Sequence, residues 1–208
     1  MSPRGRAIPD VREQLFEAAD RILSRDGPDG LTSRAITDEA GCAKGVLHNH
    51  FNDLDHFLAQ YVLDRITRTT RLAAELRSQA GQGTVAGNLT QAVMTVFGPP
   101  TLMISALLMS RPPLMAEVSQ AIAKGGPPFA DLERAISAYL DAEKDLGRIA
   151  PAADTAMIAF TVLGSVHHLF FTSGLAPLDE AQVHRIADSL LTGLGEAGPG
   201  GQVARIVG

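Results

Sequence analysis

The sequence predicts an all-α protein, and three observations support this fold class. The chain has 208 residues, of which 45% are hydrophobic and only 5% aromatic, with no Trp. Its core must therefore be built from aliphatic side chains, which favours helix packing over a β-sandwich. Clusters of Pro and Gly divide the chain, and between them apolar residues recur at helical spacing without sustained period-two alternation. We expect three N-terminal helices followed by a larger helical domain.

The first helix is expected from Val11 to about Arg25. Its single apolar stripe is formed by Leu15, Ala18, Ala19, Ile22 and Leu23. Gly27 then provides a suitable stop at the C-terminal end, because glycine readily adopts the left-handed conformation that closes many helices.

The next two helices are short. Thr32 is a suitable N-cap for a helix through Ala40, and Gly41 ends it. A third helix is expected over about Lys44–Phe51, since Leu47 and Phe51 are spaced four residues apart. Two short helices joined by a tight turn that contains Gly are typical of a helix-turn-helix.

The remainder of the chain also predicts helices. Asn52-Asp53 is expected to cap a fourth helix that runs as far as Ala80, and residues 59–195 contain six or so helical segments between Pro and Gly breaks. The helix over Asp154–Phe171 is apolar nearly all round and must be buried on both sides. The last helix, Asp179–Leu194, has one apolar stripe, formed by Val183, Ile186, Leu190 and Leu194. Together these two helices are good candidates for an isologous four-helix interface between two copies of the chain.

The N-terminal pattern is specific enough to indicate a family. It consists of Arg12, Leu15, Ala18-Ala19, Leu23, Gly27, Leu31-Thr32, Ile36, Ala40-Gly41, Gly45, Leu47, His50-Phe51 and Leu58. Residues 12–58 thereby resemble the DNA-binding region of the TetR family of bacterial repressors, without a gap from Ala40 to Phe51. The other three-quarters of the chain resemble that family only in length, helicity and order of segments.

The resemblance implies a division of the chain. Residues 1–55 are expected to form a helix-turn-helix DNA-binding domain, and residues 56–195 a helical effector-binding and dimerisation domain. Residues 196–208 are expected to be a disordered, Gly-rich tail. Arg4 and Arg6, which precede the first helix, belong either to a flexible arm that reaches the minor groove or to a disordered tail.

Three residues depart from the family pattern at phosphate or cap positions. Ala43 stands where the family usually has a small hydroxyl residue, so the recognition helix loses its side-chain N-cap at a cost of about 1 kcal/mol. His48 replaces a common Tyr, and Leu54 replaces a frequent Lys. These changes affect the usual phosphate contacts more than the helix-turn-helix itself.

The expected DNA-binding residues lie on the second and third helices. They are Thr32, Ser33, Arg34, Lys44, Gly45, Val46, His48, Asn49 and His50. Lys44 is a donor for guanine or phosphate, Val46 can meet a thymine methyl, and Gly45 would let the backbone approach the groove. The resemblance implies a backbone contact for His50. The alternatives are a partly buried histidine at position 50 and a plain solvated lysine at position 44.

Charge sets a limit on this interpretation. The whole chain has a formal net charge of −5, and residues 1–58 hold seven Lys and Arg against ten Asp and Glu, a net charge of −3. Any DNA binding must therefore come from the placement of a few donors rather than from gross charge.

In the C-terminal half, the resemblance implies a small-molecule pocket between helices and a dimer built on the last two long helices. The candidate pocket residues are Met94, Phe97, Met103, Leu107, Phe160 and His167. Met suits a pocket that repacks around a ligand, although Met at helical spacing also fits an ordinary core. An apolar pocket indicates an uncharged or lipophilic effector.

Several other classes of function are excluded. The single cysteine, Cys42, rules out a disulfide framework within the chain and a Cys-rich zinc site. His167 and His168 are adjacent on a helix and point about 100° apart, so no metal site is expected. No catalytic motif is present, so we expect no enzyme and no cofactor. No apolar run reaches the ~18 residues of a membrane span, and the N-terminus does not fit a signal peptide, so we expect a soluble cytoplasmic protein without membrane contact.

Two functional hypotheses follow. The first is a one-component transcriptional regulator, a repressor that binds a palindromic double-stranded operator as a homodimer and leaves it on binding a small lipophilic effector. The alternative is a helical ligand-binding or interaction protein without specific DNA binding. The absent cap and the substituted phosphate residues keep this alternative open.

Overall fold

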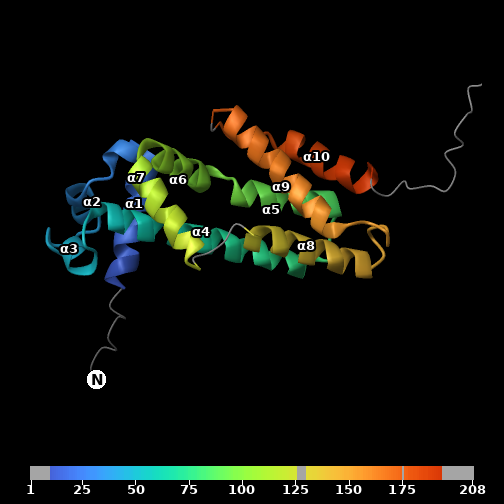
Figure 1. Cartoon of the computed structure of the whole chain (residues 1–208), viewed down its shortest axis with the longest axis horizontal. Helices are drawn as coiled ribbons and strands as arrows, with labels where there is room; N and C mark the ends of the chain where they lie inside the picture. Colours follow the sequence, from blue (N-terminus) through green and yellow to red (C-terminus); the bar gives the residue numbers. More distant parts are fainter. Residues whose placement is uncertain (1–9, 126–129, 175, 194–208) are drawn as a thin grey trace, which may run out of the picture.

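The computed structural model describes residues 10–125, 130–174 and 176–193. Within these ranges the chain is all-α and contains no strand (Figure 1). The elements are α1 (Val11–Asp26), η1 (Pro28–Gly30), α2 (Ser33–Glu39), α3 (Val46–His50), α4 (Leu54–Ala74), η2 (Glu75–Gln79), α5 (Val85–Val96), α6 (Pro99–Ser110), α7 (Pro112–Ala123), α8 (Ala130–Asp145), α9 (Thr155–Thr172) and α10 (Glu180–Gly193). The predicted fold class is confirmed.

Local caps explain where the first helices begin and end. The Thr32 hydroxyl accepts a hydrogen bond from the Ala35 amide at 3.1 Å and so starts α2. Asp53 starts α4 by accepting from the His56 amide at 2.8 Å. Gly27 ends α1 with a positive φ of 72°, a conformation that costs glycine little. The predictions for these three boundaries are confirmed.

The third and fourth helices differ in detail from the prediction. α3 begins at Val46 instead of Lys44 and has no side-chain cap. Ala43 has no hydroxyl to satisfy the first amides, so a backbone turn from Val46 N–H to the Ala43 carbonyl precedes the helix. α4 ends at Ala74, and the chain continues as the 3₁₀ helix η2 to Gln79 in place of one helix to Ala80.

The described residues pack around two hydrophobic cores. The first core is formed by α1–α4 together with one face each of α6 and α7, including Leu107 and Leu114. The second is formed by η2, α5, α8, α9 and α10. Figure 1 shows these two groups at opposite ends of an elongated molecule, with α4 extending from one to the other.

α4 therefore joins the two expected domains. Its first turns contribute Phe57, Leu58 and Tyr61 to the N-terminal core, whereas Ala73 packs in the C-terminal core. A boundary between residues 55 and 56 falls within the first turn of this helix. The two domains cannot move independently without bending α4 or sliding the elements that pack against it.

α9 is long and apolar enough to cross a membrane by length and composition alone. Seven of its residues nevertheless pack inside the protein, against α8 and α10: Thr155, Ile158, Ala159, Val162, Leu163, Val166 and Phe170. The other side of α9 exposes Met157, Phe160 and Phe171. In α10, Val183 and Ala187 are buried, whereas Leu194 lies outside the described residues, as do Arg4, Arg6 and residues 196–208.

Candidate functional site

The turn between α2 and α3 is held by the backbone and by one buried hydroxyl. Gly41 has a φ of 65°, and the Cys42 amide donates to the Thr37 carbonyl at 2.9 Å. The Thr37 side chain is buried and donates back to the Ser33 carbonyl at 3.0 Å. Cys42 is half-buried at this turn. Hydrogen bonds within the protein therefore fix the geometry of the turn between α2 and α3.

α3 is anchored on one side and open on the other. Leu47 is buried, and Phe51, the residue after the helix, packs against Phe57 at a ring distance of 4.9 Å. Phe16 from α1 lies 5.5 Å from Phe57, and Arg12 stacks on the rings of Phe16 and Phe51. This aromatic cluster fixes α3 relative to α1 and α4, so α3 is presented as a rigid surface.

The residues predicted to bind DNA lie on the open side of α2 and α3. Thr32, Arg34, Lys44, Gly45, His48, Asn49 and His50 are exposed, and Ser33 and Val46 are half-buried. No atom lies within 4 Å of a Cβ built on Gly45, so packing within the chain does not require glycine there. Arg34 forms an exposed ion pair with Asp38 at 3.5 Å. The structure brings all nine residues to one end of the molecule.

Much of the acidic charge of this domain is paired away from α3. Glu39 receives a hydrogen bond from Arg21 at 2.7 Å and one from Arg25 at 3.1 Å, and these bonds hold its pKa below the ordinary value. The turn and helix from Gly41 to Phe51 contain no Asp or Glu. The exposed part of this segment therefore carries Lys44 in the turn and two histidines on α3, with no carboxylate among residues 41–51.

A cavity of about 130 Å³ lies between α4, α6, α8 and α9. Its apolar wall is formed by Ile66, Val96, Phe97, Ile104, Leu108, Leu132, Phe170 and Phe171. Its polar groups come from Arg65, Thr69, Thr70, Thr101, Ser105 and His167. The cavity is therefore largely apolar, with a few groups that can orient a ligand.

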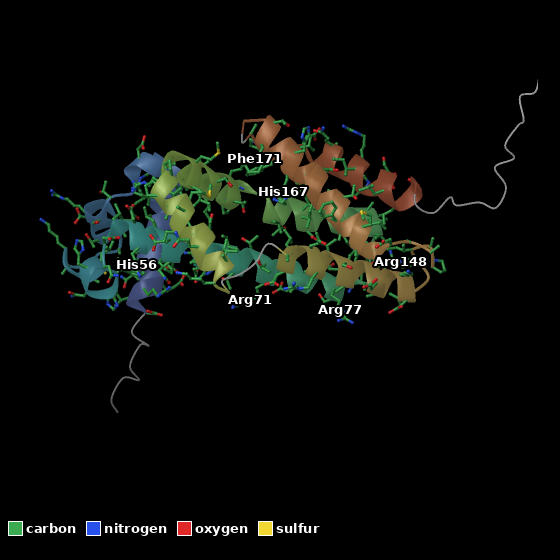
Figure 2. The ribbon with its side chains drawn as sticks, in the orientation of Figure 1. His56, Arg71, Arg77, Arg148, His167 and Phe171 are labelled. Atoms are coloured by element: carbon green, nitrogen blue, oxygen red, sulfur yellow. The ribbon has the colours of Figure 1, made fainter. Side chains whose placement is uncertain are left out.

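His167 is positioned by its own helix and by an aromatic neighbour. Its Nδ1 lies 2.8 Å from the Leu163 carbonyl oxygen, which can only accept, so Nδ1 carries a proton. In the neutral ring Nε2 is then the acceptor. The ring meets Phe97 edge-on at 4.9 Å, and Figure 2 shows His167 and Phe171 at the same end of α9.

Two of the predicted pocket residues, Phe97 and His167, line this cavity, and four do not. Leu107 is buried in the N-terminal core, because it lies about 200° around α6 from Ser105, which lines the cavity. Phe160 is 60% exposed, because it lies on the outward side of α9 with Met157, about 10 Å along the helix from His167. Met94 packs against the C-terminal core, and Met103 packs at the edges of both cores.

The sequence reasoning missed Arg65, the one charged side chain that lines the cavity. A signal for it existed. Arg65 continues the apolar stripe of α4 set by Leu58 and Tyr61, and a charged residue in such a stripe is rarely buried without a partner. Thr101 and Ser105 gave less signal, because α6 is apolar on most sides and its sequence does not show which side faces inward.

Comparisons with known proteins agree with the helix-turn-helix described above. Residues 15–60 match the family described as "Bacterial regulatory proteins, tetR family". A curated relative from Haemophilus influenzae, named "Uncharacterized HTH-type transcriptional regulator", is 34% identical over 55 residues, which are 26% of this chain and 29% of that protein. The match thus spans less than a third of that relative.

The likeness to solved structures extends over nearly the whole chain. A TetR-family regulator from Mesorhizobium loti, described as putative, superposes with a TM-score of 0.68 at 18% identity, covering 91% of this chain and 97% of that one. FadR from Bacillus subtilis, solved with stearoyl-CoA, gives a TM-score of 0.56 at 14% identity, covering 87% and 98%. Residues 15–60 therefore match the tetR family in sequence, and the chain as a whole has the fold of a solved TetR-family regulator.

Proposed function

We propose that this chain is a one-component transcriptional regulator: a repressor that binds a palindromic operator as a homodimer and leaves it when a small molecule binds. The observation that carries the proposal is the open side of α3. His48, Asn49 and His50 are exposed there on a helix that the aromatic cluster holds in place, and Lys44 is exposed in the turn just before it. The relative from Haemophilus influenzae is itself named a transcriptional regulator of the helix-turn-helix type.

The contacts divide into those that position the protein and those that read bases. Lys44 and His50 donate to phosphates, which fix the register on the duplex. The Thr32 oxygen accepts a hydrogen bond from the Ala35 amide, and its hydroxyl proton is left to donate to a phosphate. Gly45 lets the backbone approach the groove, and Val46 and Asn49 meet base edges. The segment has few cations, so specificity depends on this placement.

The dimer is built on the exposed side of α9 together with α10. Met157, Phe160 and Phe171 are large apolar side chains that a monomer leaves in water, and Gly164 between them has open space above it. Contiguous apolar surface of this kind marks an interface. A two-fold dimer then sets the two recognition helices roughly 34–36 Å apart, one turn of DNA.

The effector is small, neutral and lipophilic. A cavity of about 130 Å³ is close in size to an engineered apolar cavity of about 150 Å³ that binds benzene. An anion is disfavoured, because the charge of Arg65 is already neutralised by Asp20 and Asp64. A cation finds no carboxylate in the wall and would lose its hydration without compensation. Related structures carry other ligands: stearoyl-CoA in FadR and proflavin in EbrR.

A salt-dependent gel shift with DNA that flanks the chain's own coding region tests the proposal. We expect specific binding whose affinity falls steeply with salt, as phosphate contacts require. Binding no tighter than to unrelated DNA would favour a helical ligand-binding protein without an operator. We place the protein in the cytoplasm, where an operator is accessible, and we assign it no enzymatic activity and no cofactor.

Matched probes test the effector class. Toluene, benzoate and benzylammonium share one ring and differ in charge. We expect toluene alone to raise the melting temperature, since only a ligand that binds the folded state stabilises it. Stabilisation by benzoate or benzylammonium and not by toluene would show that a charged ligand is preferred.

A further inference from the structure

Arg65 occupies a place between the cavity and the N-terminal domain. Its side chain is only 8% exposed. It lines the cavity described above and also a second hollow, between α1, α4 and α6, that Asp20 and Tyr61 line. Thr69, Thr101 and Ile104 likewise border both spaces. Arg65 is thus part of the partition between the cavity and α1.

On the α1 side, Arg65 holds Asp20 with two contacts. Its Nε donates to Asp20 Oδ1 at 3.0 Å, and its Nη2 lies 2.8 Å from Asp20 Oδ2. The Tyr61 hydroxyl donates to the same Oδ1 at 2.6 Å, and burial followed by this hydrogen bond raises the pKa of Tyr61. Nη1 of Arg65 donates to Asp64 at 2.6 Å. The Nε hydrogen bond and the Nη2 ion pair thus tie one guanidinium to both oxygens of the Asp20 carboxylate.

We propose that Arg65 is the residue through which occupation of the cavity moves the DNA-binding domain, by way of Asp20; this inference rests on the proposed function. Ile66, Thr69 and Thr70 form the α4 wall of the cavity, so a ligand that fills it shifts this part of α4. Because Arg65 holds Asp20 by both oxygens, α1 follows α4 instead of sliding past it. The helix-turn-helix then moves with α1, against which α2 packs.

Another contact between α1 and α4 supplies a matched control. Arg12 donates to Gln60 Oε1 at 2.8 Å, and neither residue lines the cavity. Removing this hydrogen bond weakens the packing of α1 on α4 without touching the partition. If Arg65 and Asp20 carry the coupling, Gln60 has no special part in it.

A cavity-filling substitution tests the inference without knowledge of the ligand. Ser105→Phe places a ring in the cavity from the α6 side, and the smaller Ser105→Leu serves if the phenylalanine variant does not fold. We expect Ser105→Phe to change operator affinity by at least about fivefold, the lower end of typical allosteric coupling. With Asp20→Asn present, the same substitution should change affinity by about twofold or less, the usual error of additivity.

The control variants sharpen this result. In the Gln60→Ala background the full effect of Ser105→Phe should persist, and Arg65→Lys, which keeps the charge without the fork, should give an intermediate effect. An equal effect of Ser105→Phe with and without Asp20→Asn overturns the inference. So does an effect within twofold in an otherwise wild-type protein that binds its operator.

Failure of the proposed function would be seen separately, as a wild-type protein that does not bind operator DNA. The coupling is then measured by hydrogen exchange in the full chain. We expect Ser105→Phe to change the exchange of amides in α1 by at least about fivefold, and Asp20→Asn to abolish that change. Unchanged exchange in α1 while α6 amides respond would overturn the inference on its own.

Discussion

At the scale of single residues, exposure separates side chains that hold the fold from those left available to a partner. Lys44 is exposed and forms no ion pair among the described residues, whereas Glu143 is completely buried and pairs with Arg148 at 3.1 Å. The two charged groups were equally visible in the sequence. The sequence predicted a role only for Lys44, because that prediction depends on the spacing of nearby residues. The role of Glu143 depends on a loop 62 residues away, whose Gly81 amide donates a hydrogen bond to the Glu143 carboxylate.

Replacing Lys44 with Ala should weaken operator binding and leave the fold intact. Loss of one phosphate contact lowers the slope of log affinity against log salt by roughly one unit. Arg77→Ala is the matched control, because Arg77 is an exposed arginine far along the molecule from α3 (Figure 2). Gel shifts across a salt series measure both slopes. An unchanged slope for Lys44→Ala would remove this residue from the DNA contact surface.

The Tyr139 hydroxyl gives a prediction about alkaline pH. It donates to Glu143 at 2.7 Å, and burial followed by this hydrogen bond raises the pKa of Tyr139 above its ordinary value of 10.0. A raised pKa contributes stability that is present below about pH 10 and is lost at higher pH, because only the unfolded chain releases the proton readily. The difference in melting temperature between wild type and Tyr139→Phe should therefore shrink between about pH 9 and pH 11. A difference that does not vary with pH would contradict this.

At the scale of elements, the sequence predicted those helices whose start and buried face are encoded locally. Thr32 and Asp53 cap α2 and α4, and the stripe that includes Leu15 fixes the buried face of α1. The cavity could not be predicted in the same way. It is formed where α4, α6, α8 and α9 meet, and nearby residues of α6 face different spaces: Ser105 lines the cavity, whereas Leu107 is buried in the N-terminal core. An element that is apolar on most sides gives no periodicity from which to choose its inward face.

Gly45 tests the role of α3 as an element. A side chain at this position meets no atom within 4 Å, and φ is −81°, so Gly45→Leu should fold with a stability within about 1 kcal/mol of wild type. The bulky side chain should nevertheless abolish specific operator binding, because it holds the backbone away from the groove. Gly45→Ala, with one methyl group, should retain most of the affinity. Thermal melts and gel shifts on both variants decide the matter, and full affinity in Gly45→Leu would show that close approach is not required.

At the scale of the whole molecule, the proposed operator binding depends on the distance between two recognition helices, which a single chain cannot set. A monomer carries a single recognition helix, and in the proposed dimer the spacing of two such helices depends on how α9 and α10 meet their copies. The cavity borders the same surface, because Phe171 lines the cavity and is also part of the exposed side of α9. Because the α9 sequence is apolar nearly all round, it predicted a helix that is buried on two sides. Which residues face outward became visible only once α8 and α10 were placed against the helix.

Phe160→Asp should convert the dimer to a monomer that keeps its helical content and loses operator binding. The side chain is 60% exposed, so a charge there does not disturb the core of the single chain, but it would be buried without a partner in a two-fold interface. Leu146→Asp is the matched control, since Leu146 is 57% exposed just after α8 and its side chain lies beside Gly81 instead of on α9. Leu190 is less suitable, because it packs partly against the C-terminal core. Sedimentation at micromolar concentration should show monomers for Phe160→Asp and dimers for Leu146→Asp. A dimeric Phe160→Asp variant, or a monomeric wild type, would remove α9 from the interface and with it the proposed spacing of the recognition helices.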